Sequence, residues 1–505
     1  MVAHEWLSQL AMYQAVEAWG VLGVRWLCAV LASVVVLALF AWLRRDGVPP
    51  ALALLGTLAY VAVAQGRFQV RPHMFHLLIF IALYGYLFVH RPKLRPRELI
   101  GIIFATTVWL NIHSAGLIFP ALVVLYVAVE CLQQLFGWRQ PESSDLGEGK
   151  WQRLAILALG VVAASLITPH QFRVFPYVME SIEVNTASSE WLPITSFWDR
   201  RERMQFSVEA FWLIGGLTWL VALGSIRRVS SSLLAVVLAL SFMPLTAQRH
   251  LSVYFAPVLF SFGELARWLR RQPAGRTRAA VQGTISVAAL ITVLVMTPQL
   301  LNFPRDLEWI GRYPSSSHNF SDHVFPVGAV DFLNKVRLES RLYHPARWGG
   351  YIEWETHGSY PTFSDGRWVT IGKKIMSDGY GIEVRAASTF SKLDEYGINL
   401  LLVPRGWTEE ATGWKRGWLT LFENVNAGVY LRNTPETRSD LERVREYYVF
   451  EGVPFDPVFG FDEHIAYKWN NGWARRFRVE RTHLDQFRMS ETTVIRSGGN
   501  RVNGW

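Results

Sequence analysis

Long apolar stretches separated by short polar segments occupy roughly the first 300 residues of the chain. A helix that crosses a bilayer needs about 20 mainly apolar residues. About ten stretches approach this length: residues 20–43, 48–66, 72–90, 98–113, 116–137, 152–169, 207–226, 231–247, 250–267 and 279–298. The pattern therefore predicts a mostly α fold, a polytopic membrane helical bundle of about ten spans.

Basic residues gather in the segments that follow every odd-numbered stretch. Such segments belong in the cytoplasm, because lysine- and arginine-rich loops stay on that side of the membrane. They contain Arg44, Arg45, Arg91, Lys93, Arg95, Arg97, Arg139, Lys150, Arg153, Arg227, Arg228, Arg267, Arg270, Arg271, Arg276 and Arg278. Both ends of the chain then lie outside. We therefore expect a multi-pass membrane protein. If the host is a bacterium with two membranes, this is the inner (cytoplasmic) membrane, and the C-terminal domain lies in the periplasm.

The same pattern divides the chain into four parts. Residues 1–19 have the pattern of an amphipathic helix on the outer interface, and residues 20–301 form the transmembrane helical domain. Residues 302–433 mix helical and strand-like runs, which predicts an extracytoplasmic α/β domain. Residues 434–505 form a charged C-terminal extension.

Local patterns suggest how the C-terminal parts fold. Residues 327–336 have a helical pattern, and so does one stretch of the extension, residues 436–450. Residues 341–355, 360–368 and 398–404 have the pattern of strands.

Composition supports a membrane protein and argues against several other classes. Hydrophobic residues make up 51% of the chain and charged residues only 18%, which is unusual for a soluble protein. The net charge of +9 would suggest nucleic acid as a partner of a soluble protein, but here the basic residues lie between apolar runs, so no nucleic acid is expected. Cys28 and Cys131 lie inside apolar stretches and indicate neither a disulfide framework nor a zinc site. The chain has no Walker loop, GxGxxG, HExxH or Ser-His-Asp order, which disfavours an ATPase, a dehydrogenase or a protease.

Polar residues interrupt the apolar stretches at their outer ends. Polar groups at membrane depth cost about 2–3 kcal/mol on insertion scales, so they usually face a cavity or a partner. Arginine suits phosphate because its guanidinium donates two parallel hydrogen bonds. Any one of these residues could instead be an interfacial anchor or pack between helices, but together they indicate a cavity that holds an anion. The set comprises Arg71, His73, Asn111, His113, His170, Arg249 and His250, with Glu190 in a long outer loop.

Several short motifs occur in the order found in a group of bacterial multi-pass membrane proteins that resembles the GT-C glycosyltransferase superfamily. These are VRPHMFHLLIF, VWLNIHSAGLIFP, ITPHQFRVFPY, SSEWLP, AQRHLSVYFAPVL, ARWGGYIEWE and FSDGRW, and they resemble the group's RPQ, WxNxHG, NPYG, EWxxP, RH, WGGYLIW and DGR elements. The resemblance covers about residues 1–433. It implies transfer of a sugar from a polyprenyl-phosphate carrier to an acceptor at the outer face, with a divalent metal ion such as Mg or Mn in some branches.

The chain departs from that group in two places. Thr168 and His170 stand where Asn and Tyr are usual. Relatives also carry a first span and an outer-loop Asp before the HEWL sequence, whereas this chain begins at Met1 just before it. We therefore expect that a first span and the usual catalytic Asp are missing from this sequence, and Glu5 is the acid nearest to that position.

The candidate residues can be assigned roles in sugar transfer. Glu5 and Glu190 are the candidate catalytic acids, and no residue is assigned to a metal. Arg71, His113, Arg249 and His250 are expected to bind the donor phosphate, and Asn111, His73 and His170 to orient the substrate. In the C-terminal domain, Asp365 and Arg367 flank Gly366 and either pair with each other or contact the acceptor.

The sequence leaves two functions open. The first is a membrane glycosyltransferase that uses a lipid-linked sugar and an envelope glycan or lipid acceptor. The second is a non-catalytic polytopic membrane protein, either a lipid-linked glycan transporter or an envelope-assembly scaffold. The polar residues gather at one face and no internal repeat is visible, which favours the enzyme. The missing Asp favours the alternative.

Overall fold

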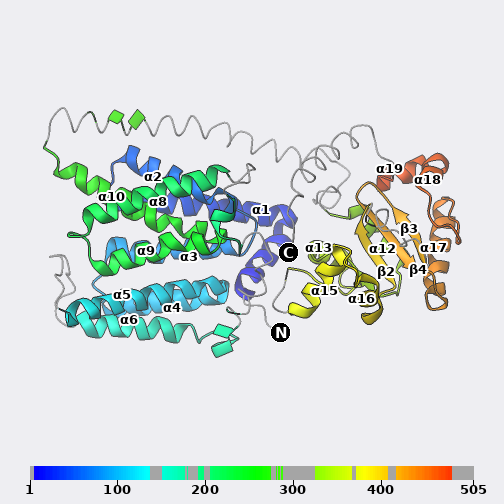
Figure 1. Cartoon of the computed structure of the whole chain (residues 1–505), viewed down its shortest axis with the longest axis horizontal. Helices are drawn as coiled ribbons and strands as arrows, with labels where there is room; N and C mark the ends of the chain where they lie inside the picture. Colours follow the sequence, from blue (N-terminus) through cyan, green and yellow to red (C-terminus); the bar gives the residue numbers. More distant parts are fainter. Residues whose placement is uncertain are drawn as a thin grey trace. The chain divides into compact units, whose positions relative to one another are not determined.

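The computed structural model divides the chain into two compact units, residues 1–304 and 305–505. It describes residues 5–136, 150–173, 175–176, 179, 191–197, 205–273, 280, 283–284, 286–287, 325–366, 371–405, 407 and 417–479. Figure 1 shows helices throughout the first unit and a small sheet flanked by helices in the second.

The first unit is built from helices joined by short turns. Its main helices are α1 (Trp6–Arg45), α2 (Pro50–Ala64), α3 (His73–Tyr84), α4 (Pro96–Ile112), α5 (Ile118–Leu135), α6 (Lys150–Ala164), α8 (Gln205–Ser225), α9 (Ser231–Thr246) and α10 (Phe255–Arg271). Shorter turns connect them: η1 (Gln65–Arg67), η2 (Gly85–His90), η3 (Ser114–Leu117), η4 (Gln171–Arg173), η6 (Ile194–Phe197) and η7 (Gln248–Tyr254).

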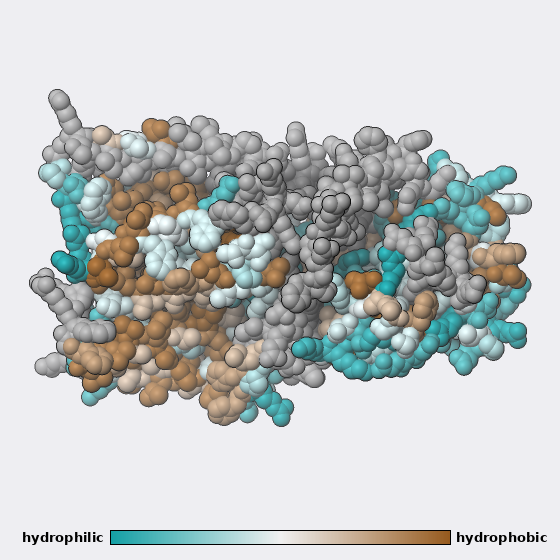
Figure 2. Space-filling model, viewed as in Figure 1, coloured by the Kyte–Doolittle hydropathy of each residue, from teal (hydrophilic) through white to brown (hydrophobic). Residues whose placement is uncertain are grey.

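These helices agree with the predicted spans. Each predicted stretch coincides with a helix, except residues 279–298, most of which lie outside the described residues. By length and composition, four helical segments of the described chain can cross a membrane: Trp6–Arg45, His73–His90, Ser114–Leu135 and Ser207–Ser225. Figure 2 shows hydrophobic residues spread over the outer surface of this unit, as lipid contact requires. The chain is a multi-pass membrane protein.

Helix α1 is broken about one third of the way along its length, at Trp19 and Gly20. Trp19 (φ −139°, ψ 16°) and Gly20 (φ 65°, ψ −167°) leave the helical region, and the positive φ of Gly20 is one that a residue without a side chain adopts at little cost. The break separates the amphipathic N-terminal segment from the apolar part of the helix, next to the boundary drawn at residue 19. Because of this break, the segment that begins at Glu5 runs in a different direction from the rest of α1.

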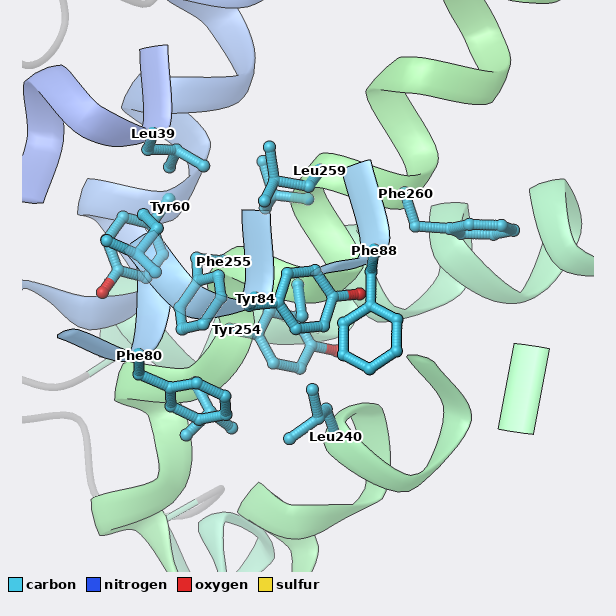
Figure 3. Packing of buried hydrophobic residues seen from close by; sticks show 14 of the residues in the cluster. Leu39, Tyr60, Phe80, Tyr84, Phe88, Leu240, Tyr254, Phe255, Leu259 and Phe260 are labelled. Atoms are coloured by element: carbon cyan, nitrogen blue, oxygen red, sulfur yellow. The ribbon is translucent and has the colours of Figure 1, made fainter. Parts of the chain in front are cut away.

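Aromatic side chains form the centre of the helical unit. The ring of Phe255, the first residue of α10, meets the rings of Phe80, Tyr84 and Tyr60 edge-on, at centroid distances of 5.0, 5.4 and 6.3 Å. Edge-to-face contact is favourable because the positive ring edge meets the negative face. Figure 3 shows these side chains converging from α2, α3 and α10.

The second unit contains a four-stranded mixed sheet in the order β1-β2-β4-β3. Strand β1 (Leu342–Tyr343) pairs parallel with β2 (Leu400–Pro404), whereas β4 (Ala427–Arg432) is antiparallel to both β2 and β3 (Trp418–Glu423). The helices are α12 (Val327–Val336), α13 (Ala346–Glu355), α15 (Lys373–Glu383), α16 (Thr389–Glu395), α17 (Arg438–Glu451), α18 (Glu463–Trp469) and α19 (Asn471–Phe477).

Both faces of this sheet are buried. Along β2, Leu400 and Leu402 belong to one hydrophobic core, whereas Leu401 and Val403 belong to a second. Alternate residues of a strand point to opposite faces, so each core occupies one side of the sheet. The α/β class predicted for this part of the chain is confirmed.

Local predictions in the second unit had mixed outcomes. The helices at 327–336 and 436–450 and the strand at 398–404 are present as α12, α17 and β2. The strand predicted over 341–355 is wrong beyond Tyr343, because residues 346–355 form helix α13.

Tertiary contacts explain why α13 is a helix. Its buried residues Trp348, Gly349, Tyr351 and Ile352 follow helical spacing. A side chain at Gly349 would come within 2.3 Å of the Ser364 carbonyl oxygen, so the glycine permits close packing of the 364–365 turn. Residues 360–366 do not form the strand predicted over 360–368, of which residues 367 and 368 lie outside the described residues.

The charged extension predicted from residue 434 includes part of the same folded unit. Val444 and Tyr448 of α17 and Trp473 and Phe477 of α19 lie in the core that contains Leu400. Residues 438–477 therefore contribute to the hydrophobic core of the second unit. Apolar positions were too sparse along this charged stretch for the sequence pattern to show that it is buried.

Close helix packing in the first unit depends on small residues. A side chain at Gly85 would lie 2.3 Å from the Trp42 ring, whereas nothing lies within 4 Å of that position at Gly101. We therefore expect Gly85→Ala to destabilise the unit by about 1–3 kcal/mol through overpacking. Thermal unfolding of the purified protein in detergent measures this effect. Gly101→Ala is the matched control, and equal stability of the two variants would contradict the packing argument.

Candidate functional site

A carboxylate and an imidazole meet at the N-terminal end of α1. The Nε2 atom of His113 lies 2.9 Å from the Oε1 atom of Glu5. The backbone N–H of Ala115 donates to His113 Nδ1 at 3.0 Å. Because Nδ1 accepts this hydrogen bond, Nε2 carries the ring proton and donates it to Glu5.

The backbone around His113 creates this geometry. His113 is extended (φ −160°, ψ 132°) between the end of α4 and the start of η3. The chain therefore turns at His113 and directs its ring across the helix end. His113 is buried, with a side chain 7% exposed, whereas the Glu5 side chain is 29% exposed.

The segment that carries Glu5 is fastened to the end of α4. Trp6 Nε1 donates to Asn111 Oδ1 at 3.0 Å, and Ser8 Oγ donates to the Ile112 carbonyl at 2.9 Å. Asn111 Nδ2 in turn donates to the carbonyls of Thr107 at 2.9 Å and Ile167 at 2.8 Å. Asn111 therefore joins three segments of the protein and positions Glu5.

Two further histidines lie beside the pair. His76 is buried, accepts a hydrogen bond from Trp109 Nε1 at 3.0 Å, and has its ring centroid 5.2 Å from that of His113. His73, the first residue of α3, hydrogen-bonds through Nε2 to the carbonyl of Arg67. The sequence analysis proposed His73 for the site and did not propose His76, and the structure places both near His113.

Cationic groups reach the pair from other segments. Arg249, in η7, is close enough to Glu5 to act on its charge, and Arg71 acts in the same way on His73. His250 Nδ1 lies 3.1 Å from the Met243 carbonyl and 3.3 Å from Thr246 Oγ1. The structure thus brings together Glu5, Arg71, His73, His113, Arg249 and His250, which the sequence had proposed from separate motifs.

The charge state of Glu5 follows from these neighbours. Burial would raise the pKa of the Glu5 carboxyl, but His113, Arg249 and His73 lower it further than burial raises it. The pKa is therefore below its ordinary value of 4.5. Glu5 is a carboxylate at neutral pH.

The remaining predicted residues lie elsewhere in the sequence or outside the described residues. The His170 backbone N–H donates to Thr168 Oγ1 at 3.3 Å, three residues after the carbonyl that Asn111 holds. Asp365 lies in the second unit, where it acts on the charge of His344. Glu190 and Arg367 lie outside the described residues.

Sequence reasoning missed several residues that shape the site, namely Trp6, Ser8, Trp109 and Trp191. Their types are common in membrane helices, and their partners are distant in the chain. Trp6 and Ser8 lie one and three residues after Glu5, and Trp109 and Trp191 stand inside the VWLNIHSAGLIFP and SSEWLP motifs, and these positions were the available signals.

The described residues do not contain a metal centre. Within those ranges, no group of three or more His, Cys, Asp or Glu side chains is arranged to hold a metal ion. The Glu5 carboxylate is near Arg249 instead, whose positive charge repels a cation. These residues do not fit Mg or Mn, and no step is assigned to such an ion.

No protein-family model matches the chain, and neither does any curated protein. Among solved structures it is similar to ArnT from Cupriavidus metallidurans bound to undecaprenyl phosphate, with 13% identity, a TM-score of 0.46 and coverage of 84% of this chain and 86% of that one. The apo form of ArnT has 14% identity, a TM-score of 0.45 and the same coverage. An Archaeoglobus fulgidus oligosaccharyltransferase tethered with an acceptor peptide has 13% identity, a TM-score of 0.41 and coverage of 82% and 63%. At TM-scores below 0.5 these likenesses assign no role to any residue, so the roles depend on the contacts of this chain.

The hydrogen bonds of Asn111 predict how its loss acts. In Asn111→Ala the carbonyls of Thr107 and Ile167 lose a donor and the Trp6 indole loses its acceptor. We expect the variant to be destabilised by about 1–3 kcal/mol and to release the N-terminal segment. Thermal unfolding, together with protease cleavage before Gly20, measures both effects. Ser33→Ala, which removes one exposed hydroxyl contact within α1, is the control. If the N-terminal segment of Asn111→Ala is as protected from protease as that of the wild type, Asn111 does not position this segment.

The lowered pKa of Glu5 predicts a pH dependence of stability. A carboxyl whose pKa is lower in the folded state stabilises the protein above its ordinary pKa, and this contribution is lost as pH falls through the folded value. Wild type should therefore exceed Glu5→Gln in unfolding temperature at neutral pH, and the difference should shrink below about pH 4.5. Glu17→Gln, exposed on the same helix, is the control. A difference that grows as pH falls would contradict the assigned shift.

Proposed function

We propose that this chain is a membrane glycosyltransferase that moves a sugar from a polyprenyl-phosphate donor to an envelope glycan or lipid acceptor. The reaction takes place at the outer face of a bacterial inner membrane, with the second unit in the periplasm. The observation that carries the proposal is the Glu5–His113 pair, set among arginine and histidine side chains at the ends of apolar helices.

The pair supplies the base that glycosyl transfer requires. The acceptor hydroxyl gives its proton to the Glu5 carboxylate while its oxygen attacks the anomeric carbon of the sugar. His113 holds Glu5 through the Nε2 proton, and its Nδ1 is engaged by Ala115. His113 therefore keeps one tautomer throughout the reaction and orients the carboxylate.

The low pKa of Glu5 is compatible with this role once the donor is present. Arg249 and His73 help to lower the pKa of the carboxyl. A bound phosphate partly neutralises the charge of Arg249 and adds negative charge nearby, and both effects raise the pKa of Glu5. Donor binding therefore makes Glu5 a stronger base.

Arginine and histidine side chains stabilise the leaving group, the arginines by charge and the histidines as hydrogen-bond donors. As the bond between the anomeric carbon and the phosphate oxygen breaks, its electron pair stays on the phosphate. Arg249 binds this phosphate through its paired N–H groups, assisted by Arg71, His73 and His250. Apolar helix surfaces hold the isoprenoid chain, and Asp365 and Arg367 remain candidates for acceptor contact in the second unit.

Substitution tests the assignment in membranes that contain the protein and a polyprenyl-phosphate sugar. We expect Arg249→Ala to lower sugar transfer about 100- to 1,000-fold, because a preorganised charge is lost, and Glu5→Gln to lower it about 100- to 10,000-fold. His113→Ala should also abolish transfer while leaving protein levels intact. Radiolabelled sugar transferred to lipid or glycan is the measurement.

Matched controls use residues of the same type far from the site. Arg97 is exposed at the start of α4, and the His464 side chain is 81% exposed in the second unit. Arg97→Ala and His464→Ala should transfer sugar at the wild-type rate. Full activity in both Arg249→Ala and His113→Ala would place the site elsewhere. A folded wild-type protein that transfers no sugar would support a transporter or scaffold.

A further inference from the structure

Trp191 lies against the candidate phosphate-binding arginine. The Cζ atom of Arg249 lies 4.3 Å from the centroid of the Trp191 ring. A guanidinium within about 6 Å of an indole face is attracted by the ring's quadrupole. Trp191 comes from the loop between α6 and α8, so this contact joins two segments that are far apart in the chain.

Backbone contacts hold Trp191 in this place. The Gln248 N–H donates to the Leu192 carbonyl at 2.8 Å, which ties the residue after Trp191 to the residue before Arg249. Ile194, at the start of η6, is 1% exposed and anchors the same segment in the helical core.

The arginine side of the contact is held as well. The Arg249 carbonyl accepts from Ser252 Oγ at 3.2 Å, and the Ser252 carbonyl accepts from Tyr60 OH at 3.0 Å. Tyr60 belongs to the aromatic centre of the bundle. The segments that carry Trp191 and Arg249 are therefore both tied to the helical core.

Contact with the indole face restricts the guanidinium in a way that suits phosphate. A ring that covers one side of the guanidinium limits the directions in which its N–H donors can point. A planar fork held in one orientation loses less freedom when it forms paired hydrogen bonds with an anion.

We infer that Trp191 is a positioning residue that holds the Arg249 guanidinium in place for the donor phosphate. This inference rests on the proposed function, because it takes Arg249 to be the group that binds phosphate. Trp191 touches Arg249 rather than the reacting atoms. A tryptophan that only packed the loop would stabilise the protein without any dependence on Arg249.

Binding of undecaprenyl phosphate to the full chain in lipid nanodiscs tests this role without requiring catalysis. Trp191→Leu should weaken binding about 2- to 30-fold, the range that one cation–π contact supplies. Trp191→Phe, which keeps an aromatic face, should restore most of the affinity. Trp26→Leu, which removes a tryptophan 71% exposed on α1, should bind as the wild type does.

A double-mutant cycle separates positioning from packing. In an Arg249→Ala background, Trp191→Leu should cause no further loss of binding, because the group that it positions is gone. An equal loss in both backgrounds, or unchanged binding by Trp191→Leu alone, would overturn the inference while leaving the proposed function intact. If the folded wild-type protein binds no undecaprenyl phosphate, both the proposed function and this inference fall.

Discussion

An ionised carboxylate beside membrane helices needs a nearby donor or cation, because water is scarce there and an isolated charge is costly. In this protein the Nε2 proton of His113 meets that need for Glu5 at 2.9 Å. The pairing constrains much of what surrounds it. His113 must be extended at the end of α4, and the segment that begins at Glu5 must dock against that helix end. The break at Trp19 and Gly20 allows this segment to depart from the line of α1.

The site joins side chains that differ in burial. His76, Trp109 and Tyr60 are deeply buried and belong to the packed interior, where positions are tightly defined. Arg249 and Glu5 are less buried, and a cation–π contact and a hydrogen bond hold them in place. The packed interior thus supports the charged groups of the candidate site.

The second unit shows where local patterns mislead. Alternating and mixed runs around 341–368 resemble strands, but a parallel strand of two residues and a helix satisfy the tertiary contacts better. The charged run after residue 434 was separated from the domain by its composition, although every few residues it supplies an aromatic side chain to the core. In both places burial depends on a few residues at particular positions. A hydrophobicity average over a window of sequence does not detect them.

The sequence by itself determined the helices of the membrane unit, their boundaries to within a few residues and the α/β class of the second unit. Hydrophobic length and periodicity are local properties, and the bilayer demands them. It also identified His113 and Arg249 as candidates, because polar residues at the ends of apolar stretches stand out, and Glu5 as the acid nearest to the position of the expected first-loop Asp. Only the tertiary structure decided which of these residues touch. Trp6 and Asn111 are 105 positions apart, and no local pattern contains their hydrogen bond. The same holds for Trp191 and Arg249, whose contact exists because separate segments pack on one core.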